Sequence, residues 1–135
     1  MKIIIWNDIY SVGIKEIDSQ HKQLVNMINS LYKDMNSDKP PQELSNVLNS
    51  LTDYTIKHFS TEEELMMKYD YADFNEHKDE HTQLVNDIKK FRADYVAGKV
   101  SLSMDIAKYL KDWLMNHIME TDKKLGEFLN KLGIY

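Results

Sequence analysis

Apolar residues recur every three or four positions through most of the chain and form four separate stripes. This spacing places them on one face of an α-helix, and strand-like alternation is weak beyond the first five or so residues. The stripes are Leu24, Val25, Ile28, Leu31, Tyr32 and Met35; Leu44, Val47, Leu48, Leu51, Tyr54, Leu65 and Tyr69; Leu84, Ile88, Phe91 and Tyr95; and Ile106, Leu110, Trp113 and Leu114. The pattern predicts four amphipathic helices.

The segments between the stripes indicate where these helices begin and end. We expect the first helix to start after Asp18, whose carboxylate can cap the opening turn, and to end in residues 36–41, which contain both prolines. The other boundaries are expected at residues 70–73, with Asp73 as a cap, near Gly98, and at Ser101 or Ser103.

Both ends of the chain lie outside the four stripes. The first 17 residues have no clear period, and we interpret them as an arm packed across the helices; residues from about Thr121 onward should form a short helix or tail. Short connections between long helices favour antiparallel neighbours. We therefore predict an all-α fold, an antiparallel up-down-up-down four-helix bundle in which residues 1–135 form a single domain.

The composition limits the chemistry available to this bundle. The chain contains no cysteine, which excludes disulfides, thiolate zinc sites, Cys-ligated iron–sulfur clusters and Cys nucleophiles. Any metal must therefore be held by nitrogen and oxygen atoms.

Charge and hydropathy limit the partners and the location. The net charge is −5, with acidic and basic residues mixed along the chain, so nucleic acid and anionic membranes are poor partners. The apolar run at residues 3–6 is too short for a signal peptide or a membrane span. We expect a cytoplasmic protein without a membrane span, and the lack of an extra apolar stripe favours a monomer.

Histidine is the residue type that departs from ordinary surface behaviour. Each of the five histidines extends an apolar stripe and so should face the interior: His21, His58, His77, His81 and His117. Burying five imidazoles without partners would cost about 1–3 kcal/mol each, which a stability of about 5–15 kcal/mol could not tolerate. Shared metal ligation removes this cost, because it occupies one ring nitrogen and leaves the other for a hydrogen-bond acceptor.

Two carboxylates are spaced to join these histidines. Glu62 lies four residues after His58, one helical turn away on the same face. Asp122 lies five residues after His117, which is not a same-face interval in a regular helix, so we predict that the helix ends or bulges between them.

The number of donors indicates two metal ions. Five imidazoles and two carboxylates exceed what one six-coordinate ion accepts. Two ions fit if both carboxylates and one solvent oxygen bridge them: one ion then has six ligands and the other five, with an open position for a small ligand. Mixed imidazole and carboxylate donors suit iron or manganese.

These residues resemble the hemerythrin family over nearly the whole chain. The matching pattern is Ile17-Asp18-Ser19-Gln20-His21, His58-Phe59 with Glu62, His77 and His81, and Trp113-Leu114-Met115-Asn116-His117-Ile118 with Asp122. The resemblance implies a non-haem di-iron centre with a bridging oxo or hydroxo group that binds dioxygen reversibly, as a carrier, store or delivery protein.

The resemblance also implies a role for each residue. His77, His81 and His117 would ligate one iron, His21 and His58 the iron with the open position, and Glu62 and Asp122 would bridge. An apolar O2 pocket would be lined by Leu24, Phe59, Leu114 and Ile118. Glu63 and Glu64 are interpreted as a solvated face.

Two other functions remain open from the sequence. One is a di-iron enzyme, such as an oxidase, peroxidase or nitric oxide reductase, although the paired Glu-x-x-His motifs of carboxylate-rich di-iron oxidases are absent. The other is a sensor of O2 or iron. A separate protein would have to read the signal of a sensor, because the sequence shows no output domain, and an unidentified protein partner for O2 delivery or reduction stays open.

Overall fold

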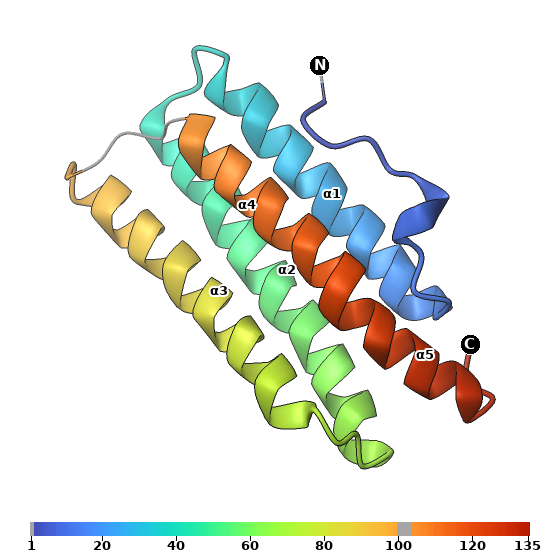
Figure 1. Cartoon of the computed structure of the whole chain (residues 1–135). Coiled ribbons are helices and arrows are strands. Elements are labelled where there is room, and N and C mark those ends of the chain that lie inside the picture. The colour runs from blue at the N-terminus through green and yellow to red at the C-terminus, as the bar shows by residue number, and fades with distance from the viewer. Residues whose placement is uncertain (1, 100–103) are drawn as a thin grey trace.

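The computed structural model describes residues 2–99 and 104–135, and this part of the chain is helical without strands. The elements in chain order are η1 (Asp8–Tyr10), α1 (Lys15–Met35), α2 (Pro41–Lys68), α3 (Phe74–Val96), α4 (Met104–Asn116), η2 (His117–Asp122) and α5 (Lys123–Lys131). Helices α1, α2, α3 and α4 run alternately in opposite directions, and α5 continues the line of α4 (Figure 1). The predicted antiparallel four-helix bundle is confirmed.

The apolar stripes become the interior of this bundle. Leu31, Leu48 and Leu51 are among the fully buried side chains, as expected for helices that bury one face against their neighbours. Pro41 occupies the first turn of α2, where its fixed φ suits a helix start and its missing N–H costs nothing. None of the described helices is both long and apolar enough to cross a membrane.

The expected start of the first helix was wrong. Helix α1 begins at Lys15, and Asp18 lies in its first turn with its N–H bonded to the carbonyl of Ile14. The Asp18 carboxylate instead accepts hydrogen bonds from the Val12 N–H at 2.8 Å and the Ser11 hydroxyl at 2.5 Å. Asp18 therefore fixes the incoming chain rather than capping the helix.

The N-terminal residues form the expected arm across the bundle (Figure 1). The Asn29 side chain on α1 makes two hydrogen bonds to the backbone of Ile4, both 2.9 Å long. At the other end of the arm, the backbone of Val12 passes directly over Gly126 of α5. A Cβ atom at position 126 would lie 2.0 Å from the Val12 carbonyl oxygen, so only glycine permits this crossing.

The remaining boundaries agree in part with the expectations. Helix α3 ends two residues before Gly98, which has a φ of +74°, a conformation typical of a glycine that terminates a helix. Asp73 precedes α3 as expected, but its side chain makes no capping bond. Ser101 and Ser103, the expected start of the fourth helix, lie outside the described residues.

Candidate metal centre

The bundle brings all seven predicted metal ligands together at one level. His21 comes from α1, His58 and Glu62 from α2, His77 and His81 from α3, and His117 and Asp122 from the two ends of η2. Each of these side chains is at most 3% exposed. Their ligand atoms fall into two groups, and within each group the atoms lie within 4.8 Å of one another.

The two carboxylates belong to both groups. Glu62 Oε1 lies 3.2 Å from His77 Nε2 and 3.0 Å from His81 Nε2, while Glu62 Oε2 lies 3.0 Å from His58 Nε2. Glu62 therefore presents one oxygen to a three-histidine group and the other oxygen to a two-histidine group.

Asp122 repeats this division. Its Oδ1 lies 3.0 Å from His77 Nε2 and 3.1 Å from His117 Nε2, and its Oδ2 lies 2.9 Å from His21 Nε2. The three-histidine group thus has five protein donors and the two-histidine group has four. This asymmetry agrees with the prediction that one ion has six ligands and the other has five and an open position.

The donors are spaced as ligands of a shared metal ion are, although two of the pairs are also aligned as hydrogen bonds, His77 Nε2 with Glu62 Oε1 at 3.2 Å and His81 Nε2 with His117 Nε2 at 3.1 Å. An octahedral ion with bonds of about 2.1 Å holds neighbouring donors roughly 3.0 Å apart. The buried atoms without a hydrogen-bond partner include His21 Nε2, His58 Nε2, Glu62 Oε2 and both Asp122 oxygens. These atoms are close together but poorly aligned as donor–acceptor pairs, as lone pairs directed at a shared ion would be. The donor set fits two transition-metal ions such as iron.

The π-helical turn η2 explains how Asp122 reaches the centre. His117 and Asp122 are its first and last residues, and the wider π turn brings positions five apart onto the same side of the helix. The predicted break between these residues is therefore confirmed as a bulge. The Thr121 hydroxyl donates a 2.8 Å hydrogen bond to Glu80 of α3, which ties the turn to the neighbouring helix.

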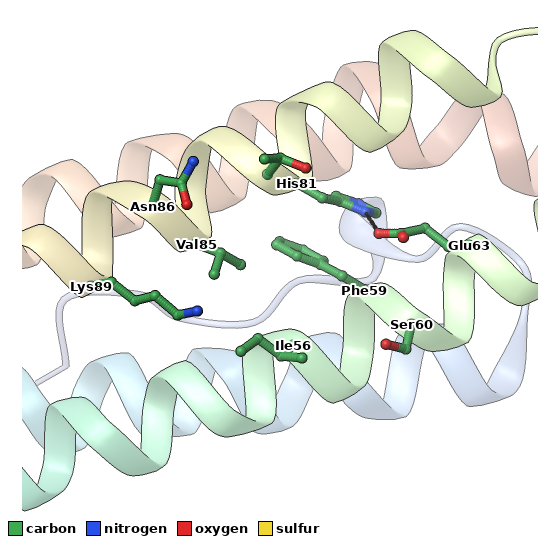
Figure 2. Close-up of a pocket in the computed structure, with 9 residues that line it drawn as sticks. Ile56, Phe59, Ser60, Glu63, His81, Val85, Asn86 and Lys89 are labelled. Carbon is green, nitrogen blue, oxygen red and sulfur yellow. Dashed lines mark hydrogen bonds and ion pairs between the residues drawn. The ribbon is translucent and has the colours of Figure 1, made fainter.

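Three further residues hold the outer nitrogens of the histidines. His58 Nδ1 is paired with Gln20 Oε1 at 2.7 Å, His81 Nδ1 with Glu63 Oε2 at 2.9 Å, and His117 Nδ1 with Glu80 Oε1 at 2.9 Å. Figure 2 shows the contact between Glu63 and His81 across α2 and α3. Such acceptors orient imidazole ligands and make them more basic.

These three acceptors were missed from the sequence, and the interpretation of Glu63 as part of a solvated face was wrong. Each acceptor is the immediate chain neighbour of a predicted ligand but serves a histidine on the next helix. Gln20, beside His21, contacts His58 on α2. Glu63, beside Glu62, contacts His81 on α3, and Glu80, beside His81, contacts His117 on η2. Adjacency to a ligand was the available signal, but the partner follows only from the packing.

The charges in the centre shift the pKa values strongly. Burial alone would lower the pKa of His21, but close contacts with Asp122 and Glu62 outweigh it and raise the pKa to about 9. Burial also opposes a charge on His117, but its contacts with Asp122, and then with Glu80 and Glu62, outweigh this and raise the pKa of His117 to about 10. Burial and the nearby Glu62 would raise the pKa of Asp122, but the imidazoles of His117 and His21 hold it far below its usual range.

An apolar cavity of about 20 Å³ lies between buried side chains of the bundle and is lined in part by Leu24, Phe59 and Leu114. Its one hydroxyl, on Thr55, donates to the Leu51 carbonyl at 2.7 Å. Ile118 is fully buried in η2 but is not part of this lining.

Aromatic rings cover two of the histidines. The Phe59 ring is stacked on His81, with a 3.7 Å separation of centroids and a 2° angle between planes, and Trp113 is stacked on His117 at 4.5 Å. Phe59 and His81 also line a surface pocket of about 280 Å³ between α2 and α3 (Figure 2). Phe59 thus lines both this pocket and the apolar cavity.

Comparison with known proteins gives a consistent result. Residues 12–129 match the family model of the hemerythrin HHE cation binding domain. A bacteriohemerythrin of Methylococcus capsulatus is 34% identical over 131 residues, which cover 96% of this chain and 99% of the relative. A bacteriohemerythrin of Pseudomonas aeruginosa is 34% identical over 122 residues, covering 90% of this chain and 78% of the relative.

Solved structures agree with this comparison. A crystal structure of wild-type hemerythrin superimposes with a TM-score of 0.88 at 32% sequence identity, covering 93% of this chain and 96% of that chain. The L114A mutant of a hemerythrin superimposes with a TM-score of 0.89, also at 32% identity, covering 94% and 97% of the two chains.

Proposed function

This chain belongs to the hemerythrin family, and we propose from that membership and from its centre that it binds dioxygen reversibly at two iron ions. The observation that carries the proposal is the division of seven buried donors into groups of three and two histidines that share both carboxylates. Two ferrous ions would supply the electrons needed to bind O2 reversibly. The role of the chain would be to hold the ions, leave one position open and exclude water.

We assign the ligands on this basis. In the proposal, His77, His81 and His117 hold one iron and His21 and His58 hold the other. The bridging ligands are Glu62 and Asp122, with a solvent-derived oxo or hydroxo group as the third bridge. This assignment is supported by the two carboxylates, each of which directs one oxygen at the three-histidine group and the other at the two-histidine group.

The apolar cavity supports the assignment of an O2 pocket lined by Leu24, Phe59 and Leu114, and Ile118 is buried in η2 outside this lining. A wall without free polar groups keeps water and acid away from bound oxygen and so keeps binding reversible. The Thr55 hydroxyl is occupied by a backbone carbonyl, so this wall offers no proton donor to bound oxygen. That absence among the cavity-lining side chains favours reversible binding over a di-iron enzyme.

The remaining assignments are proposals of the same kind. We propose that residues 1–135 form one domain, since the family match spans residues 12–129 and the arm is tied to α1 by Asn29. Large exposed apolar side chains lie on separate segments, such as Ile5 in the N-terminal arm and Met67 on α2, which supports a monomer. A protein partner for delivery or reduction and a cytoplasmic location stay predictions.

Spectroscopy on iron-loaded protein tests the proposal. Pure protein should contain two iron ions per chain, and the reduced form should acquire a stable oxygenated absorption spectrum in air that disappears under vacuum. Rapid irreversible oxidation accompanied by turnover of a substrate would support the enzyme alternative. Protein that retains no iron after anaerobic loading would refute the metal centre itself.

A further inference from the structure

A second surface pocket reaches the centre from the side of α3 and η2. It has a volume of about 380 Å³. Its wall includes four carboxylates, one ammonium group and one buried imidazole: Asp73, Glu76, Glu80, Glu120, Lys124 and His77. We call this pocket the acidic vestibule. Its excess of negative charge lies beside a ligand of the proposed iron centre.

We propose that the acidic vestibule holds a hydrated divalent cation before the cation reaches the buried centre, so that it is the loading site for iron. This inference rests on the proposed function, because it assumes that metal ions must reach the seven buried ligands. Those ligands are at most 3% exposed, so an ion needs a defined path from water.

His77 connects the vestibule with the centre. Its Nε2 lies 3.0 Å from Asp122 Oδ1 and 3.2 Å from Glu62 Oε1, inside the cluster. Its other nitrogen, Nδ1, is buried and has no hydrogen-bond partner, in a residue that is 1% exposed and lines the vestibule. A buried polar nitrogen without a partner is costly, and His77 is the one predicted ligand in the lining of the vestibule.

The vestibule carboxylates divide into engaged and available groups. Glu80 accepts hydrogen bonds from His117 and Thr121, so it belongs to the support of the centre. Glu76 and Glu120 are exposed, and within the described part of the chain their carboxylates make no hydrogen bond or ion pair. Oxygen-rich, water-filled surroundings of this kind suit a hydrated divalent ion.

A different surface pocket that also touches a predicted ligand lacks this character. The pocket of Figure 2 touches His81, but its wall has the apolar side chains Ile56, Phe59 and Val85 and balances one acid with Lys89. Its acid, Glu63, is already paired with His81. A cation is attracted to the vestibule more than to this pocket, because a cleft with an excess of one sign of charge concentrates ions of the opposite sign.

The rate of cobalt(II) uptake by the metal-free full-length chain tests the proposal. Cobalt occupies nitrogen and oxygen sites and reports binding by its visible absorption, so uptake can be followed by stopped-flow without any O2 activity. The test variant is Glu76→Gln/Glu120→Gln. The matched control, Asp53→Asn/Asp112→Asn, removes the same charge from exposed positions on α2 and α4, and Glu76→Asp/Glu120→Asp keeps the charge in place.

We expect the test variant to take up cobalt about three- to tenfold more slowly than the unaltered chain and with a weaker dependence on salt. Its final stoichiometry, spectrum and equilibrium affinity should match those of the unaltered chain, and the other two variants should load at nearly the normal rate. Equal uptake rates for the test and control variants would overturn the vestibule but leave the centre intact. Failure of the unaltered chain to bind cobalt would overturn both.

Discussion

Glu63 and its neighbour Glu64 offer a direct test of how the centre is built. The two residues have the same charge and are adjacent on α2, but only Glu63 contacts a predicted ligand, at 2.9 Å from His81 Nδ1. Its side chain is 20% exposed, whereas Glu64 is an exposed residue. Replacing an acceptor that orients a metal-bound imidazole weakens metal binding by roughly 10- to 100-fold, or about 1.4–2.7 kcal/mol.

The expected effect can be divided between geometry and charge. Glu63→Ala removes both, so its effect should fall in that range. Glu63→Gln keeps a hydrogen-bond acceptor but loses the charge, and the difference between charged and neutral hydrogen bonds is about 1 kcal/mol, or roughly fivefold. Because Glu63 is partly exposed, the loss of metal affinity in Glu63→Gln should be no larger than this fivefold effect.

Competition with a chelator provides the measurement. The fully loaded chain should release its two ions in separate phases, and Glu63→Ala should weaken the ion held by the His81 group more than the other. Glu64→Ala is the matched control and should change neither affinity by more than about twofold. Equal losses for Glu63→Ala and Glu64→Ala would refute the reasoning, because the contact with His81 would then contribute nothing to metal binding.

Three further predictions concern the arm, the cavity and the response to pH. Gly126→Ala should lower the melting temperature, because the new Cβ displaces Val12 at a cost of about 1–3 kcal/mol. This cost exceeds the gain in helix propensity of about 0.5–1 kcal/mol. A higher melting temperature would contradict this prediction. Phe59→Ala should destabilise the fold by about 3–5 kcal/mol in denaturant titrations and shorten the life of the oxygenated spectrum, whereas an unchanged lifetime would remove Phe59 from the O2 pocket. In the metal-free protein, the raised pKa values of His21 and His117, about 9 and about 10, mean that protonated imidazoles stabilise the fold below pH 6.5 and that this contribution is lost as the pH rises through 9–10. Incoming ions must displace these protons, so calorimetry should show metal affinity rising between about pH 6.5 and 9, by about 1.4 kcal/mol per pH unit for each proton released; an affinity independent of pH in that range would contradict it.

The fold could be predicted because burial follows the helical period over long segments. The stripe that contains Leu48 and Leu51 is long enough for its period to outweigh local signals, and both residues are buried. The start of α1 could not be predicted in the same way. Asp18 is a residue type that often caps helices, but Ile14 and Ile17 are buried and the helix starts before Asp18. The Asp18 carboxylate therefore binds the backbone of the arm.

The site could be predicted to the level of its donors but not of their supports. The five-residue interval from His117 to Asp122 is incompatible with a regular helix, so it indicated a bulge, and η2 is that bulge. The pairing of Glu63 with His81 joins two helices whose relative rotation is not encoded by any local spacing. The acidic vestibule could not be predicted from local spacing either, because residues of α3 and of η2 together form its wall.

The outer acceptors also make the two proposed ion positions unequal. The three-histidine group has charged acceptors on two of its rings, Glu63 and Glu80, whereas the two-histidine group has one neutral acceptor, Gln20. A carboxylate acceptor makes an imidazole a stronger donor than a neutral amide does, and the three-histidine group also has one more protein ligand.

The ion in the two-histidine group should therefore be held more weakly and should leave first when a chelator is added. Ion loss can be ordered by following the spectrum of a chain that carries cobalt in both positions, with His58→Ala identifying the two-histidine phase and His81→Ala the three-histidine phase. Gln20→Glu should narrow the difference between the phases, because it gives His58 a charged acceptor of nearly the same shape. Release of the three-histidine ion first would show that the outer carboxylates do not govern how tightly each ion is held.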